Sequence, residues 1–396
     1  MRHFSAYPNE KLANAYLFQR GTPGWNRCWR FYSDNARHRH GKFLVRGAIR
    51  AYNFTVWHLG VKQLYFHPTL AFRQENEQIK AFEPELIYSV ANAESSLALV
   101  NGICQSVPTS VPLIQYFMDF EQRVGLRCTR YLRAVVRRAD EIWALTDAMV
   151  ETISPFAERH NKRVRIQPGF HINLPKMNRA EIRTANDPRF RCVIIGNFWL
   201  LDVVPYLRRV WNRLQRAIPN LSAIQWYCPS RGSKLVHRLG TLEPEIVAMK
   251  FIESRELERV LMDSDLAIVP FNLKDNPENS YAKYSLPSRL TELAACGVPM
   301  FCIAGSATPL ARFVVSNDIG VVASGEDENS LIEKLKALIE APKLRYELSS
   351  RARAFAECHF DLDVFQHDLY ERLGSFVGKH TILQRNAGLL QGHSSG

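Results

Sequence analysis

Short runs of consecutive apolar residues alternate with helical patterns along the second half of the chain. Strands are predicted at 191–196, 222–228, 247–252, 265–271, 300–304 and 320–324. Helices are predicted at 203–217, 234–239, 254–262, 288–296 and from 309, and three more at 330–339, 343–359 and 363–373. Because the apolar runs are continuous, both faces of the sheet are expected to be covered. The pattern predicts a doubly wound, Rossmann-like α/β domain.

The first half of the chain shows a less regular version of the same alternation. Strands are predicted at 85–90, 110–117, 141–145 and 164–169, and helices at 74–82, 97–101, 125–139 and 147–160. A polar, proline-containing linker is expected at 172–189. We therefore predict two Rossmann-like domains facing across a cleft, an N-terminal one over 1–180 and a C-terminal one over 181–360. A C-terminal helix within 361–396 is expected to cross back, followed by a frayed tail.

Length and charge fit this division of the chain. The 396 residues suit two domains, and the net charge is +12. Residues 1–185 carry a net charge of +11 and the remainder +1, so an anionic partner is expected on the first half. No apolar run is long enough to span a membrane, no secretory signal is visible, and the eight cysteines form no C-x-x-C pair. A cytoplasmic protein is the expectation.

The segment from 260 to 299 offers the clearest candidate chemistry. A predicted strand ends at Pro270, a polar loop follows, and a helix starts at Ser288. Free N–H groups at the helix start and the cation of Arg289 suit a diphosphate. Glu292 lies one turn on from Ser288 and suits the hydroxyls of a ribose. The alternative is a solvated ion pair between Arg289 and Glu292.

This segment resembles the C-terminal domain of GT-B glycosyltransferases, especially the family-4-type group. The matching residues are Asp265-Leu266, Pro270, Arg289-Leu290, Glu292, Gly297 and Pro299, with Arg289 in place of the usual Lys. The segment 142–153 and the turn at 168–171 resemble other parts of that family's pattern. The resemblance extends from Glu85 to Leu373. It implies a metal-independent enzyme that binds a UDP- or GDP-linked sugar in its C-terminal domain.

Two departures from the family pattern leave the stereochemistry open. Tyr284 stands where retaining members carry the first Glu of an E-x7-E motif. The loop after the first strand of the C-terminal domain, Gly196-Asn197-Phe198, carries no cation and resembles that of the xanthan-type glucuronosyltransferase. Arg231 and Lys234 are the best substitute cations, and a solvated loop is the alternative. The predicted donor-binding residues are Gly196, Asn197, Phe198, Arg231, Tyr284, Ser285, Ser288, Arg289 and Glu292.

In the first half, Asp119 follows the predicted strand 110–117. A carboxylate at the carboxyl end of a strand faces the ligand edge of the sheet, where it can accept a proton from an acceptor hydroxyl. Asp119 is therefore the candidate catalytic base, and a loop or helix cap is the alternative. The helix 125–139 is rich in arginine, which suits an anionic membrane surface or, as alternatives, single-stranded nucleic acid or solvent alone.

These patterns together predict a glycosyltransferase that moves a sugar from a nucleotide sugar to a glycan or lipid-linked acceptor in bacterial polysaccharide or glycoconjugate synthesis. Expected partners are the donor, the acceptor and the inner face of the cytoplasmic membrane, with no nucleic acid and no metal. The alternative is a catalytically degenerate GT-B protein that binds carbohydrate or a protein partner.

Overall fold

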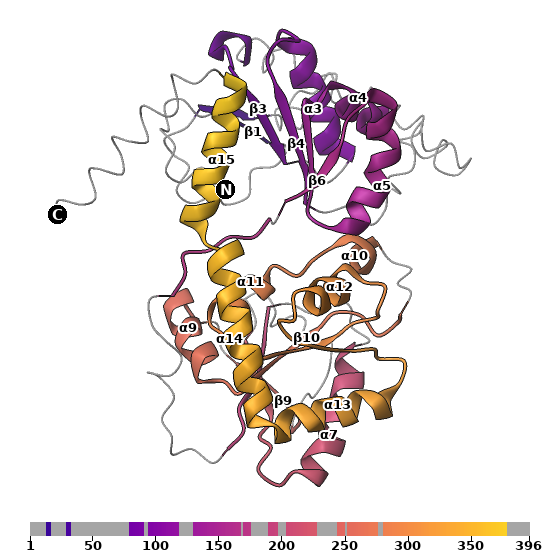
Figure 1. Ribbon diagram of the computed structural model, residues 1–396, viewed down its shortest axis with the longest axis vertical. Coiled ribbons are helices and arrows are strands. Elements are labelled where there is room, and N and C mark those ends of the chain that lie inside the picture. Colours follow the sequence, from indigo (N-terminus) through magenta and orange to yellow (C-terminus); the bar gives the residue numbers. More distant parts are fainter. Residues whose placement is uncertain are drawn as a thin grey trace, which may run out of the picture. The chain divides into compact units, whose positions relative to one another are not determined.

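A computed structural model describes most of the chain between residues 79 and 377. The described residues are 13–16, 29–32, 79–90, 94–118, 130–167, 169–175, 189–196, 203–227, 244–249, 252–275 and 280–377. They divide into two compact units (Figure 1). The first unit combines the described residues up to Gly169 with those from Gln366 onward, and the second unit is Phe170–Phe365. The predicted boundary at residue 180 stays a prediction, because residues 176–188 lie outside the described ranges.

The second unit is built on a sheet of six parallel strands in the order β12-β11-β10-β7-β8-β9. In this sheet Val193 pairs with Gln225 on one side and with Ala267 on the other, so β7 is central. The strand order reverses direction at β7, as in a doubly wound fold. The strands are β7 (Cys192–Ile195), β8 (Ile224–Tyr227), β9 (Ile246–Met249), β10 (Leu266–Pro270), β11 (Met300–Ile303) and β12 (Val321–Ala323).

Helices connect these strands, and the core lies between the helices and the sheet. Trp211 and Leu207 of one helix pack with Trp226 of β8, Phe301 of β11 and Leu335 of another helix in a single buried cluster. The helices are α7 (Val203–Ala217), α9 (Ser254–Asp263), α10 (Ser280–Tyr284), α11 (Arg289–Ala295), α12 (Pro309–Ser316), α13 (Glu328–Glu340) and α14 (Pro342–His359). All predicted strands of this half are present, and α10 is an addition that no periodicity indicated.

The first unit contains a sheet of four parallel strands in sequential order, β3-β4-β5-β6. Right-handed crossovers between sequential parallel strands place the connecting helices on one face. The other face is covered by α15 (Leu362–Val377) (Figure 1). Arg372 of this helix lies over the ring of Trp143. The elements are β3 (Ile87–Val90), α3 (Glu94–Ser106), β4 (Leu113–Phe117), α4 (Arg130–Arg138), β5 (Glu141–Ala144), α5 (Asp147–Ala157), η8 (Glu158–His160) and β6 (Val164–Ile166).

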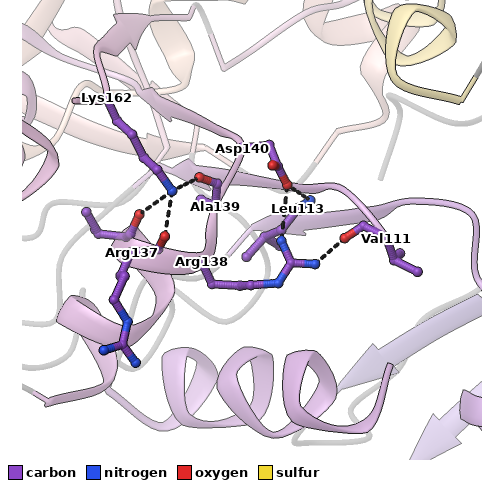
Figure 2. Close-up of polar contacts among 8 residues, drawn as sticks. Val111, Leu113, Arg137, Arg138, Ala139, Asp140 and Lys162 are labelled. Carbon is purple, nitrogen blue, oxygen red and sulfur yellow. Dashed lines mark hydrogen bonds and ion pairs between the residues drawn. The ribbon is translucent and has the colours of Figure 1, made fainter. Parts of the chain in front are cut away.

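The C-terminal end of α4 is fixed by a polar network at the amino edge of this sheet (Figure 2). Lys162 donates hydrogen bonds to the carbonyl oxygens of Val136 at 3.3 Å and Arg137 at 2.6 Å, and also to that of Ala139. A cation at this end also suits the helix dipole. The carboxylate of Asp140 accepts a hydrogen bond from the backbone N–H of Leu113 at 2.8 Å and so ties the start of β5 to β4.

Two further strands lie in the first 40 residues, where the sequence predicted none. They are β1 (Ala13–Tyr16) and β2 (Trp29–Tyr32), which pair in parallel. None of the helices in the described part of the chain is long and apolar enough to cross a membrane.

Candidate functional site

The carboxyl ends of β7 and β10 mark the ligand edge of the second unit. These neighbouring strands carry connections that leave in opposite directions along the sheet, which is the place where open α/β sheets bind ligands. Gly196 follows β7 directly, and the loop after β10 leads to α10 and α11. The segments that the sequence singled out therefore converge on one edge.

Gly196 has a backbone conformation that few other residues adopt, with φ at +89°. Its N–H donates to the carbonyl oxygen of Tyr227 at 2.9 Å, and its carbonyl oxygen accepts a hydrogen bond from the indole N–H of Trp226 at 2.8 Å. Both partners belong to β8. The turn after β7 is thus held by two hydrogen bonds to the neighbouring strand.

The side chain of Arg289 lies directly against Gly196. A Cβ atom on Gly196 would lie 3.1 Å from Nε and 3.3 Å from Cγ of Arg289. The missing side chain therefore makes the space that Arg289 occupies. Arg289 reaches this position from the first turn of α11, so a cation from one segment lies on a glycine from another.

Glu292 completes this arrangement. Nη1 of Arg289 donates to Oε1 of Glu292 at 3.0 Å, so the i, i+3 ion pair of the alternative interpretation is present. The pair is not simply solvated, because Oε2 of Glu292 is buried without a hydrogen-bond partner among the described residues. A buried carboxylate oxygen without a donor is costly, and a ligand hydroxyl is a suitable donor.

The other predicted residues of this segment precede the pair in the sequence. Ser285 is buried, Tyr284 is half-buried and Ser288 is exposed at the start of α11. The Ser288 side chain makes no capping hydrogen bond, and its carbonyl oxygen accepts from the N–H of Thr291 at 3.2 Å. The N–H of Leu290 is bonded to Pro287 as well. Two of the N–H groups expected to be free at this helix start are therefore already engaged.

Four predicted site residues lie outside the described ranges: Asn197, Phe198, Arg231 and the candidate base Asp119. The strand that leads to Asp119 is present, since β4 ends at Phe117 and is buried along its whole length. In the described part of the chain, no three His, Cys, Asp or Glu side chains come together as a metal site.

Sequence reasoning missed two features of this edge. The bond from Trp226 to Gly196 had no signal, because a tryptophan in an apolar strand indicates only the core. The approach of two loops was also missed: Gly305, after β11, packs so tightly on Lys274 and Asp275 that its Cβ would lie 2.0 Å from the Lys274 carbonyl oxygen. The N–H of Ser306 donates to the Asp275 carboxylate at 3.1 Å, and this bond holds the pKa of Asp275 below its usual value.

This chain resembles known proteins in part of its sequence and in its fold. Residues 179–365 match the family described as glycosyl transferase-like. No curated protein matches the sequence of this chain.

Solved structures match over most of the chain. HepE of Anabaena, solved in complex with UDP, is 16% identical with a TM-score of 0.53, over 78% of this chain and 84% of HepE. The sucrose-phosphate synthase of Thermosynechococcus elongatus is 16% identical with a TM-score of 0.54, over 79% and 81%. The pneumococcal O-GlcNAc transferase GtfA is 13% identical with a TM-score of 0.54, over 79% of this chain and 61% of GtfA.

These likenesses in fold agree with the two parallel α/β sheets, and the family match covers the unit that carries Gly196, Arg289 and Glu292. The resemblance to GT-B glycosyltransferases drawn from the order of the sequence motifs is confirmed, whereas its family-4-type and xanthan-type parts stay predictions. The chain has the GT-B fold of these transferases, and its residues 179–365 match the glycosyl transferase-like family.

Proposed function

We propose that the chain transfers a sugar from a UDP- or GDP-linked donor to a hydroxyl group of a glycan or lipid-linked acceptor, in the synthesis of a bacterial polysaccharide or glycoconjugate. One observation carries the donor half of this proposal: the guanidinium of Arg289 lies on Gly196 at the ligand edge, beside the buried carboxylate oxygen of Glu292. The complexes of HepE with UDP and with UDP-glucose support a UDP-linked sugar as the donor.

In this proposal Arg289 binds the diphosphate and Glu292 binds the ribose. A planar guanidinium with several N–H donors can hold phosphate oxygens with two hydrogen bonds at once. The unpartnered Oε2 of Glu292 accepts a hydrogen bond from a ribose hydroxyl. Arg231 adds a second cation, and Asn197 and Phe198 contact the donor next to Gly196.

The chemical step breaks the bond between C1 of the sugar and the diphosphate oxygen and forms a bond between C1 and the acceptor oxygen. Negative charge develops on the leaving diphosphate, where Arg289 stabilises it without a metal ion. Asp119 takes the proton from the acceptor hydroxyl. Because Tyr284 stands where retaining relatives have Glu, both retention and inversion are compatible with this site.

Titration of the full chain with UDP and with GDP tests the donor site. Arg289→Ala should weaken binding of the diphosphate about 10- to 100-fold, the range of one or two charge-assisted hydrogen bonds. Arg216→Ala, which removes an exposed cation of α7 in the same unit, should leave binding unchanged. If the wild type binds neither nucleotide, the proposed donor is wrong. Turnover is then measured as hydrolysis of the matching nucleotide sugars.

For the acceptor side, we propose that the chain contacts an anionic membrane through α4. Arg130, Arg133 and Arg137 are exposed, while the apolar residues of this helix are buried in the first unit. Figure 2 shows the Arg137 guanidinium pointing away from the network in which Arg138 and Lys162 are engaged. The cations thus divide into structural ones and exposed ones.

Because the apolar face of α4 is already buried, the contact is electrostatic and not insertion. Each arginine near an anionic surface contributes about 1 kcal/mol. Flotation with vesicles of phosphatidylcholine, with and without phosphatidylglycerol, tests this contact. Reversing Arg133 and Arg137 to Glu should reduce binding to the anionic vesicles, whereas reversing the exposed Arg216 and Arg255 should not. Equal binding to neutral and anionic vesicles would contradict the contact.

A further inference from the structure

Trp226 connects the core of the second unit to the ligand edge. Its side chain is fully buried among the residues that pack β8 against α7 and α13. Its indole N–H nevertheless reaches out of the strand to the carbonyl oxygen of Gly196, 2.8 Å away, in a buried hydrogen bond. A rigid aromatic side chain anchored in a close-packed core is a firm support for the peptide that it holds.

The peptide that Trp226 holds is also the surface on which Arg289 lies. Gly196 adopts φ at +89°, a region in which a glycine has little conformational preference of its own. Two hydrogen bonds fix it there, one to Tyr227 and one from Trp226. The Arg289 side chain then lies so close that a Cβ atom on Gly196 would be 3.1 Å from its Nε. The position of the cation therefore depends on the position of this turn.

We propose that Trp226 is a positioning residue for the nucleotide donor, acting through Gly196 on Arg289 and, through the ion pair, on Glu292. This inference rests on the proposed donor site. Trp226 itself touches no substrate in it. Without the indole N–H, the Gly196 carbonyl loses a buried partner, the turn relaxes, and the guanidinium no longer presents its donors in the arrangement that the diphosphate requires.

A second tryptophan in the same unit provides a matched control. Trp211 of α7 is also fully buried, belongs to the same core cluster, and donates its indole N–H to a backbone carbonyl oxygen, that of Ser222, at 3.0 Å. Ser222 precedes β8, at the amino end of the strand, whereas Gly196 lies beside its carboxyl end. The two tryptophans thus make the same kind of bond at opposite edges of the sheet.

The experiment compares Trp226→Phe and Trp211→Phe in the full chain, using titration with UDP and GDP and thermal unfolding. Both variants should lower the unfolding temperature by similar amounts. Trp226→Phe should also raise the dissociation constant of the bound nucleotide about tenfold, the effect of one lost buried hydrogen bond. Trp211→Phe should leave the dissociation constant within about twofold. Equal dissociation constants for the two variants would overturn the inference.

A double-mutant cycle separates positioning from general loosening of the fold. If Trp226 acts through Arg289, Trp226→Phe should weaken nucleotide binding in the wild type but change it less than about twofold in the Arg289→Ala background. Additive losses would contradict the proposed route. Should Trp226→Phe fail to fold, Gly196→Ala tests the second step of the route, the contact between Gly196 and Arg289, because its methyl group would lie 3.1 Å from Nε of Arg289 and displace the side chain. Its loss of binding should likewise disappear in the Arg289→Ala background.

Failure of this inference differs from failure of the donor proposal. A wild type that binds neither UDP nor GDP removes the donor site and the positioning role together. A wild type that binds one of them, with Trp226→Phe unaffected, leaves the donor site in place and removes only the role of Trp226.

Discussion

Arg372 of α15 donates two hydrogen bonds to the carboxylate of Glu141 on β5. Nε donates to Oε2 at 2.7 Å, and Nη2 donates to Oε1. The same guanidinium lies over the ring of Trp143, whose indole N–H donates to Glu141 at 2.8 Å. The last described helix is therefore attached to the first unit by a partly buried ion pair and an aromatic ring, although it is the most distant of these elements in the sequence.

Arg372→Met should destabilise the first unit. The variant leaves a partly buried carboxylate without its two charged donors, which costs about 2 kcal/mol in the free energy of unfolding. Glu371→Gln is the matched control on the same helix, because its partner His367 is 3.5 Å away and both side chains are mostly exposed. That change should cost less than about 0.5 kcal/mol. Denaturant unfolding measures both values, and equal effects would contradict a structural role for the Arg372 pair.

The stability contributed by Glu141 should disappear in acid. Burial alone would raise the pKa of Glu141, but the hydrogen bonds from Arg372 and Trp143 and the nearby arginine charges outweigh it and lower the pKa below its usual value. A lowered pKa in the folded state stabilises the fold at a pH above the unfolded pKa of about 4.3. The contribution is lost as the pH falls through the folded pKa. The difference in unfolding temperature between wild type and Glu141→Gln should accordingly be constant near pH 7 and shrink below about pH 4.3. A difference that grows in acid would show that the pKa is not lowered.

The sequence predicted the helices and strands better than the long-range contacts between their residues. The continuous apolar runs identified every strand that the structure describes in the second unit, and the helix predicted at 203–217 is α7 with the same bounds. These features follow from local periodicity and burial. The five-residue helix α10 and the pair β1 and β2 were missed, since such short elements contain too few residues for a period to be visible.

In the candidate site, too, some residues were predicted from the sequence and others were missed. The motif pattern selected Gly196, Arg289 and Glu292, and the structure brings these three together. Trp226 and its bond to Gly196 escaped prediction, as did the bond between Arg372 and Glu141, because the partners are far apart in the sequence and each residue type has a simpler local interpretation. Long-range polar pairs depend on strand order and register, which the sequence pattern does not contain.

Gly169 follows β6 in the first unit and lies against the carboxyl end of β4. A Cβ atom there would lie 2.5 Å from the hydroxyl oxygen of Tyr116, 2.8 Å from Cε of Met118 and 2.9 Å from Cδ1 of Leu145. The Tyr116 hydroxyl cannot move freely, because it is buried and donates to the carbonyl oxygen of Gln167 at 2.8 Å. Gly169→Ala should therefore cost about 1–3 kcal/mol, as is usual for overpacking.

Tyr116→Phe tests whether the hydroxyl is the origin of this cost. Alone, the change removes the bond to Gln167 and should destabilise the unit by about 1 kcal/mol. In combination with Gly169→Ala it removes the closest clash, so the double variant should be more stable than the sum of the two single effects. Denaturant unfolding of the four proteins gives the coupling energy, and strict additivity would place the clash elsewhere.

Gly305 and Gly374 have opposite surroundings, and substitution by alanine should have opposite effects on stability. Gly305 packs against backbone atoms, since its Cβ would lie 2.0 Å from the Lys274 carbonyl oxygen and 2.4 Å from the Asp275 α-carbon. Backbone cannot rotate away as a side chain can, so Gly305→Ala should cost about 3 kcal/mol or more. Gly374 lies within α15, and among the described residues no atom outside the nearby helix backbone lies within 4 Å of its Cβ position. Gly374→Ala should stabilise the first unit by about 0.5–1 kcal/mol, because alanine loses less backbone entropy in a helix. Unfolding curves decide both signs: a neutral Gly305→Ala would mean that the two loops separate easily, and a destabilising Gly374→Ala would mean that α15 packs more closely at this position.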